Sequence, residues 1–184
     1  LLINTVATVF VLYILITLLA PISGAHFNPL VSAISFFRKE LSAASTIYFF
    51  IAQILGGSLG AVLANLMFEH PAIEPSQHVR NGSHLLLGEL IASAGLIFII
   101  FLAVKQGIDK KIPHLVAAWI GAAYFFTSST SFANPAVTIA RSLTDSFSGI
   151  NFSSVPAFIA AQIVGAALGY RAFKYLTTKA KSGK

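Results

Sequence analysis

The chain has no cysteine, which excludes disulfide bonds, thiolate metal ligands and cysteine nucleophiles. Charged residues are also scarce, at 10% of the 184 residues, whereas 56% of the residues are hydrophobic. The surface of a soluble domain of this size needs more charge than that. The composition therefore indicates an integral membrane protein.

Five apolar runs are candidates for helices that cross a hydrocarbon core about 30 Å thick, which takes roughly 20 residues. They are residues 1–20, 47–68, 85–104, 115–127 with its flanks, and 155–176. The first run lacks the basic segment and the cleavage site of a signal peptide. We therefore predict an all-α membrane protein with a single transmembrane domain over residues 1–184.

The net charge of +6 and the pI near 9.8 would also suit a nucleic-acid-binding protein. Most of the 12 lysines and arginines lie, however, at residues 38–39, 105–111 and 171–184. Alternating spans place these segments on one side of the membrane, as the positive-inside rule expects for the cytoplasmic side. We expect a cytoplasmic basic tail at residues 177–184 and no nucleic-acid partner.

An internal repeat organises the chain. The segment Phe27-Asn28-Pro29-Leu30-Val31-Ser32 resembles Ala133-Asn134-Pro135-Ala136-Val137-Thr138. At nearly the same separation, Ala52-Gln53-Ile54-Leu55-Gly56-Gly57-Ser58-Leu59-Gly60 resembles Ala161-Gln162-Ile163-Val164-Gly165-Ala166-Ala167-Leu168-Gly169. Between matching points of the two copies the chain crosses the membrane an odd number of times, so the second copy has the opposite orientation. This predicts an inverted repeat, as is common in transport proteins. Residues 1–68 form an incomplete first repeat in this interpretation, and residues 85–176 form the second.

Each Asn-Pro pair predicts the start of a short helix, because Asn is a favoured N-cap and Pro a favoured first helical residue. The segments after Pro29 and Pro135 are too short to span, so we expect two re-entrant half-helices. Irregular backbone at membrane depth is tolerated where it lines a wet cavity, which predicts a pore. Helix N-termini meeting there would repel cations, and the amides of Asn28 and Asn134 would donate to solute oxygens.

The two segments 23–31 and 132–138, which carry the Asn-Pro pairs, resemble the paired signature loops of the aquaporin and glycerol facilitator family, the major intrinsic proteins. The resemblance implies six spans plus two half-helices, one pore per subunit and a homotetramer. Two features depart from the family pattern. The first family span, with its buried Glu, has no counterpart here, and Leu30 stands where the first signature normally has Ala. We expect that about 25 to 35 N-terminal residues precede this sequence.

The resemblance also assigns a selectivity filter of four positions, which fall at Thr8, Ala122, Ser131 and Val137. Val137 stands where most members of the family have an Arg. All four side chains are small, so we expect a wide constriction that admits larger neutral solutes. The residues from Asn134 to Arg141 resemble a bacterial branch associated with arsenic-resistance operons. That implies arsenous acid and methylated arsenicals as candidate solutes, beside glycerol, urea and water, and a location in the bacterial inner (plasma) membrane.

Arg141 follows Val137 by one helical turn, so both residues face nearly the same way. We predict that Arg141 makes the outer vestibule positive and attracts polar or anionic solutes. The alternative is an Arg that reaches the lipid headgroups or pairs with Asp145.

Other polar residues and glycines are expected to have structural roles. Glu89, near the start of an apolar span, is expected to accept hydrogen bonds from re-entrant loop backbone, and a proton-relay role is the alternative. The ring of His26 is expected to brace the first loop. Two glycine pairs, Gly56 with Gly60 and Gly165 with Gly169, predict close helix packing.

The sequence thus predicts a passive channel for small neutral solutes that spans the lipid bilayer and needs no cofactor. The histidines of residues 70–84 fit no compact metal site, and no nucleophile with a partnered base indicates catalysis. Two alternatives remain. One is a water-selective pore, and the other is an ion-coupled secondary transporter, a class that usually has ionisable residues at the membrane midplane.

Overall fold

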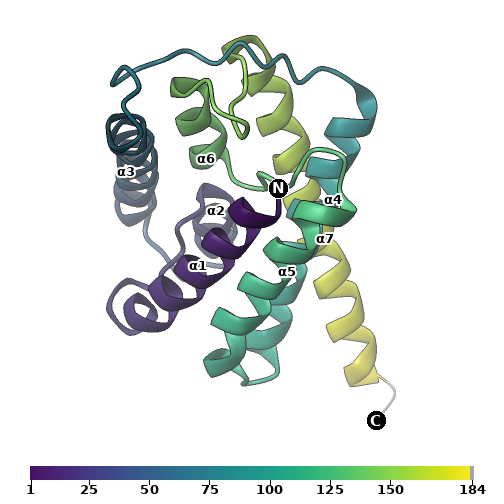
Figure 1. Cartoon of the computed structure of the whole chain (residues 1–184). Helices are drawn as coiled ribbons and strands as arrows, with labels where there is room; N and C mark the ends of the chain where they lie inside the picture. The colour runs from purple at the N-terminus through teal and green to yellow at the C-terminus, as the bar shows by residue number, and fades with distance from the viewer. Residues whose placement is uncertain (183–184) are drawn as a thin grey trace.

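The computed structural model describes residues 1–182, with side chains up to residue 178, and is helical with no strand in that range (Figure 1). The helices are α1 (Leu2–Ser23), α2 (Pro29–Phe37), α3 (Ala43–Met67), α4 (Ser83–Lys105), α5 (Ile112–Phe126), α6 (Pro135–Ala140) and α7 (Val155–Ser182). Short 3-10 turns at Asp109–Lys111, Arg141–Leu143 and Phe152–Ser154 adjoin α5, α6 and α7. The all-α membrane fold predicted from the sequence is confirmed.

Four helical segments are long and apolar enough to cross a membrane, namely Leu2–Ser23, Ala43–Met67, Ser83–Lys105 and Phe152–Thr178. The fifth predicted span is a helix too, but α5 has only 15 residues. At a rise of about 1.5 Å per residue it falls short of the hydrocarbon thickness. The basic tail expected at residues 177–184 begins within α7, which continues to Ser182. The remaining two residues lie outside the described part of the chain.

The two Asn-Pro segments form the short helices that the sequence predicts. The helix α2 has nine residues and α6 has six, and each begins at the proline. The preceding residues, Asn28 and Asn134, adopt extended backbone and cap the helices with their side chains. The two half-helices therefore exist because residues with the same capping chemistry occur at equivalent places in both repeats.

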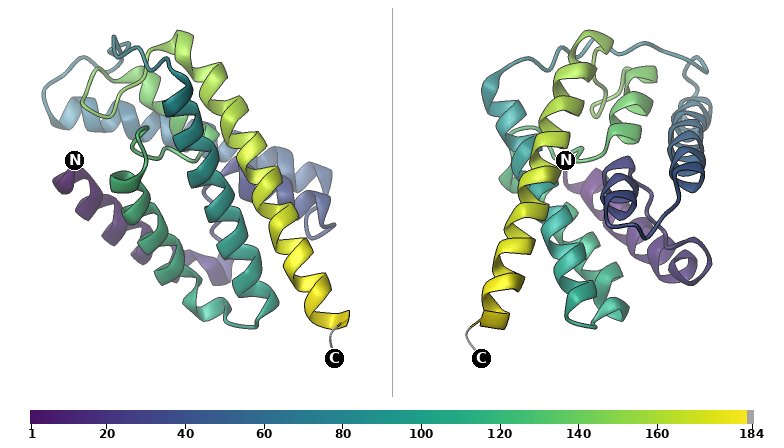
Figure 2. Two further views of the ribbon diagram at one scale, coloured as in Figure 1. Left: turned by 90° about the vertical axis from the view of Figure 1, so that its right-hand side faces the viewer. Right: turned by 180° about the vertical axis from the view of Figure 1, so that it is seen from behind.

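The helices α4 and α7 pack side by side through the glycines of α7 (Figure 2). A Cβ atom on Gly165 would lie 2.3 Å from the carbonyl oxygen of Leu90, and one on Gly169 would lie 2.1 Å from that of Ala94. Only glycine permits this approach of the two backbones. The expected packing role of these two glycines agrees with the structure.

Gly56 and Gly60 of α3 do not pack in the same way. Among the described residues, no atom lies within 4 Å of a Cβ placed on either glycine. The close packing predicted for this pair is therefore not seen among the described residues. The reason is geometric: α7 meets α4, the first helix of its own repeat, and α3 meets no equivalent of α4 in this structure.

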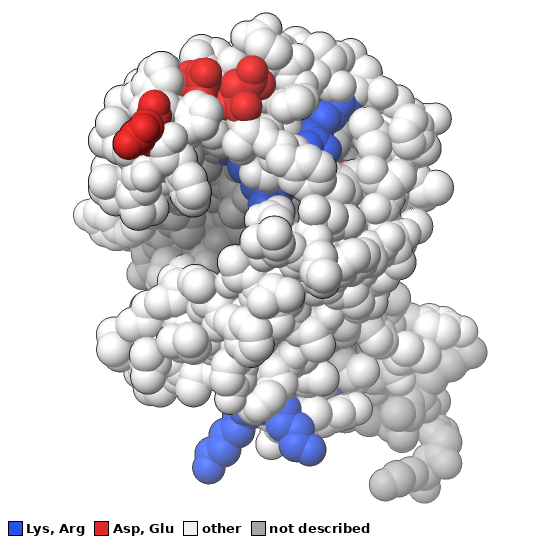
Figure 3. Space-filling model, in the orientation of Figure 1, with Lys and Arg blue, Asp and Glu red and all other residues white. Residues whose placement is uncertain are grey.

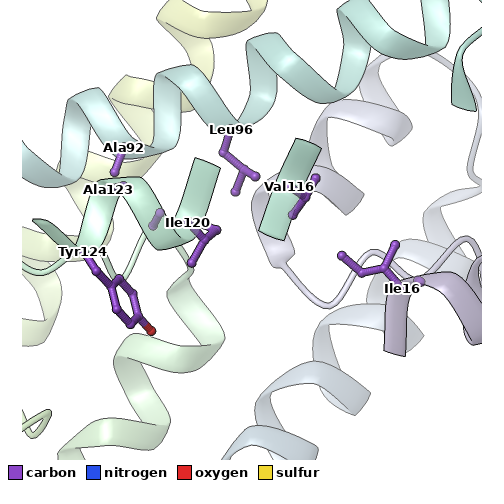
Figure 4. Close-up of a cluster of buried hydrophobic side chains, with 9 residues drawn as sticks. Ile16, Ala92, Leu96, Val116, Ile120, Ala123 and Tyr124 are labelled. Carbon is purple, nitrogen blue, oxygen red and sulfur yellow. The ribbon is translucent and has the colours of Figure 1, made fainter. Parts of the chain in front are cut away.

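A buried apolar cluster joins α1, α4 and α5 to the loop before α6 (Figure 4). Its members include Ile16 of α1, Leu96 of α4, and Val116 and Ile120 of α5. Val116, Ile120 and Tyr124 follow one another at four-residue intervals, so they lie on the same face of α5. This face of α5 also lines the cavity described below.

Candidate solute pathway

The tips of α2 and α6 meet through reciprocal hydrogen bonds of their capping residues. Asn28 Nδ2 donates to the carbonyl oxygen of Ala133, and Asn134 Nδ2 donates to that of Phe27, each over 2.8 Å. The side-chain oxygens accept from the first turns of their own helices, as caps do. Each asparagine therefore has one amide N–H left for a solute, and not both, because the other is committed to the opposite loop.

The loops before the two tips hold several non-glycine residues in left-handed backbone conformation. Ala25 and Phe27 have φ angles of 46° and 48° in the first loop, and Ser131 and Ala133 have φ angles of 49° and 47° in the second. Such residues carry a steric penalty and persist only where their surroundings hold them. Here the carbonyl groups of Phe27 and Ala133 are fixed by the amides of Asn134 and Asn28.

Glu89 is fully buried and holds the second loop from α4. Its two carboxylate oxygens accept from the backbone N–H groups of Phe132 and Ala133, each over 2.8 Å. Gln162 of α7 donates to the same carboxylate over 2.6 Å and to the hydroxyl of Thr138 over 2.8 Å. These are the contacts expected of a residue that braces the loop. The sequence placed Gln162 in a repeated segment, but its position alone did not reveal these partners.

The first loop is held by a related but weaker set of contacts. The Nδ1 atom of His26 lies 3.0 Å from the hydroxyl oxygen of Ser32, and the ring stacks on Phe49 with 5.2 Å between centroids. Gln53, the counterpart of Gln162 in the repeat, donates to Ser32 over 3.0 Å. The ring of His26 is thus placed to brace the loop, as the sequence suggested.

One cavity of about 730 Å³ runs past both capped tips. It contacts Asn28 and Asn134 and also both Pro113 and Tyr124, which lie near opposite ends of α5. The cavity therefore extends along most of the length of that helix. Glu40, Asp109 and Lys110 lie where it reaches the loops after α2 and α4, and Arg141 lies after α6.

Three of the four predicted filter residues line this cavity, namely Thr8, Ser131 and Val137. The fourth prediction, Ala122, is wrong: this residue is exposed, on the same face of α5 as Leu115 and Phe125. Tyr124 lines the cavity instead. A shift of two residues turns a helix by about 200°, so an error of two positions in counting along α5 selects the wrong face. The helical spacing from Val116 and Ile120 is a signal in the sequence that could have identified Tyr124.

Arg141 lies at the cavity and not against an acidic partner. Its Nη2 donates to the hydroxyl of Tyr124 over 3.2 Å, and its guanidinium carbon lies 4.4 Å from the centroid of the Phe132 ring. Tyr124 in turn donates to the hydroxyl of Thr8 over 3.3 Å. The alternative partner, Asp145, accepts instead from the backbone N–H of Gln77 over 2.8 Å.

Comparison with known proteins places the chain in a family. A family model described as Major intrinsic protein matches residues 1–132, so the match ends just before Asn134. The chain is 41% identical over 178 residues to Aquaglyceroporin AqpS of Rhizobium meliloti, which covers 97% of this chain and 76% of that protein. It is 30% identical over 132 residues to an Aquaglyceroporin of Toxoplasma gondii. That match covers 69% of this chain and 49% of the Toxoplasma protein. It is also 30% identical over 128 residues to Probable aquaporin PIP2-7 of Oryza sativa subsp. japonica. That match covers 65% of this chain and 43% of the rice protein. The 184-residue chain therefore belongs to the major intrinsic protein family.

Proposed function

We propose that the protein is a passive channel for small neutral solutes, with glycerol, urea, arsenous acid or methylated arsenicals, and water as its candidates. The observation that carries the proposal is the cavity that passes the two Asn-capped helix tips. Two relatives named aquaglyceroporins support the same solute class. Members of this family are channels and not enzymes, and we propose no catalytic residue.

The chemistry of the tips fits neutral hydroxylated solutes. Each half-helix directs the positive end of its dipole at the cavity, which disfavours cations there. One amide N–H of Asn28 and one of Asn134 remain to donate to a solute hydroxyl or carbonyl oxygen. The rest of the lining is mostly apolar, with residues such as Leu12, Val31 and Leu96. A solute beside these apolar residues finds no polar partner there and is held weakly enough to move on.

We expect purified protein in liposomes to conduct water, glycerol, urea and arsenous acid without a gradient of protons or sodium. Stopped-flow light scattering measures the volume change for each solute, and empty liposomes provide the background. The flux should rise linearly with solute concentration. Saturating flux that depends on an ion gradient would instead indicate a secondary transporter.

Water selectivity is the second candidate function, because Tyr124, a larger residue than the predicted Ala122, lines the cavity. A larger side chain narrows the pathway and favours water over polyols. A relative named a probable aquaporin accords with this alternative. Strong water flux without glycerol, urea or arsenous acid flux would decide in favour of it.

The width of the pathway at Val137 provides a test by mutation. We expect Val137→Phe to lower glycerol flux about tenfold, equivalent to roughly 1.4 kcal/mol in the barrier, and to reduce water flux less. Ala122→Phe is the matched control, because residue 122 lies on the exposed face of α5. If Ala122→Phe blocks glycerol and Val137→Phe does not, the assignment of Tyr124 and Val137 to the pathway is wrong.

We further propose that the protein resides in a bacterial plasma membrane as a homotetramer with its C-terminus in the cytoplasm. The basic segments near residues 38, 105 and 171 support this orientation. Apolar side chains exposed on α1 and α3, such as Phe10, Leu55 and Leu59, are suited to lipid or neighbouring subunits. Cross-linking of the purified protein in mild detergent tests the tetramer.

A further inference from the structure

Two arginines flank one aromatic ring beside the cavity. The guanidinium carbons of Arg80 and Arg141 lie 5.0 Å and 4.4 Å from the centroid of the Phe132 ring. Figure 3 shows basic atoms inside a hollow of the surface, below a rim where acidic atoms gather. Bringing two cations together is unfavourable unless each is stabilised by other groups.

The two arginines differ in how they are stabilised. Arg80 donates to the carbonyl oxygens of Gly149 over 2.7 Å, Phe147 over 3.2 Å and Ser129 over 3.5 Å. Burial and the nearby charge of Arg141 hold the pKa of Arg80 below its ordinary value. Arg80 therefore acts as a fixed positive group that ties the outer loops together.

Arg141 has far fewer partners. Among the described side chains, its contacts are the hydroxyl of Tyr124 and the ring of Phe132, and it forms no ion pair with a carboxylate. A guanidinium has five N–H donors, so most of its donors remain available at the cavity it lines. Tyr124 accepts from Arg141 and donates to Thr8, which holds the guanidinium in place.

A second group that lines the same cavity lacks a partner. Ser131, the residue before Phe132, is only 1% exposed and lines the cavity. Its hydroxyl oxygen has no hydrogen-bond partner among the described residues. A buried hydroxyl without a partner is unfavourable, so a ligand that accepts from it gains a hydrogen bond at little competing cost.

We propose that Arg141 and Ser131 form a binding subsite for a small oxygen-bearing anion, such as a carboxylate or a sulfonate, with Tyr124 as the positioning residue. The subsite deepens the proposed channel function and rests on it. The anion accepts from the guanidinium and from the Ser131 hydroxyl, while Phe132 and Val137 contact its apolar substituent. Because the subsite lies in the pathway, a bound anion obstructs the flux of neutral solutes.

The test compares two probes of similar shape and different charge. Methanesulfonate is an anion at every working pH, whereas dimethyl sulfone is neutral. Either probe is added to both sides of liposomes that contain the protein, and the initial rate of glycerol uptake is measured. We expect methanesulfonate to inhibit uptake at concentrations at which dimethyl sulfone does not.

Two variants test whether methanesulfonate inhibits glycerol uptake by binding at the proposed subsite. Arg141→Gln should raise the half-inhibitory concentration of methanesulfonate about tenfold or more, since a hydrogen bond to a charged group is lost. Ser131→Ala should raise it about two- to tenfold, and this variant carries the test if Arg141→Gln does not fold. Arg171→Gln is the matched control, because Arg171 is exposed on α7 and does not line the cavity.

The two proposals fail in different ways. Absence of glycerol uptake above empty liposomes would refute the channel. Normal glycerol uptake with equal inhibition by both probes, or with inhibition unchanged in both Arg141→Gln and Ser131→Ala, would overturn the anion subsite alone.

Discussion

Replacement of Glu89 by alanine is expected to lower the free energy of unfolding by at least about 3 kcal/mol. The change leaves the backbone N–H groups of Phe132 and Ala133 and the amide of Gln162 without their acceptor in a buried place. Each unsatisfied buried donor costs about 1–3 kcal/mol. Thermal unfolding followed by size-exclusion chromatography in detergent measures the loss.

Two further variants separate this bracing role from a general effect of charge. Glu89→Gln keeps one acceptor oxygen and should lose less stability than Glu89→Ala. Glu69→Gln removes a carboxylate from an exposed position in the loop after α3 and should leave stability nearly unchanged. A stable Glu89→Ala protein with altered solute selectivity would contradict the bracing role and support a role for Glu89 in conduction.

Replacement of Gly165 by alanine is expected to destabilise the protein by about 1–3 kcal/mol, the usual range for overpacking. The added Cβ would lie 2.3 Å from the carbonyl oxygen of Leu90 and 2.9 Å from its Cα, so α4 and α7 must separate. Loss of this contact also disturbs the glutamate of α4 and the glutamine of α7 that brace the second loop. Thermal unfolding of the 184-residue chain again provides the measurement.

The matched control is Gly56→Ala, at the equivalent position of the first repeat. No described atom lies within 4 Å of the added Cβ, so the change should stabilise α3 by up to about 1 kcal/mol through helix propensity. The two variants are therefore expected to shift stability in opposite directions. Equal destabilisation by both would mean that another helix covers the glycine face of α3.

The local features of the pathway could be predicted from the sequence. The pairs Asn28-Pro29 and Asn134-Pro135 carry their own capping chemistry, so each specifies a helix start wherever the chain places it. The long apolar helices follow from composition, since their backbone groups must be satisfied within the segment in lipid. A structural role for Glu89 could also be predicted, because a charge in an apolar helix requires partners.

The contacts between distant segments could not be predicted in this way. Counting along the chain placed Ala122 in the filter, but the face that α5 turns inward depends on its packing against α1 and α4. The glycines of α3 and α7 look alike in sequence, and only the position of α4 distinguishes the packed pair from the open one. The partners of Arg141 depend likewise on where Tyr124 and Phe132 lie in space.

The sequence by itself therefore determined the membrane class, the inverted repeat and the two capped half-helices, because these depend on hydrophobicity and on hydrogen bonds within a few residues. The tertiary structure alone decided which side chains share the cavity, how the two asparagines divide their N–H groups, and that Arg141 has fewer hydrogen-bond acceptors than Arg80. These features depend on helix rotation and on contacts across more than 100 residues, such as that between Asn28 and Ala133, which local pattern does not encode.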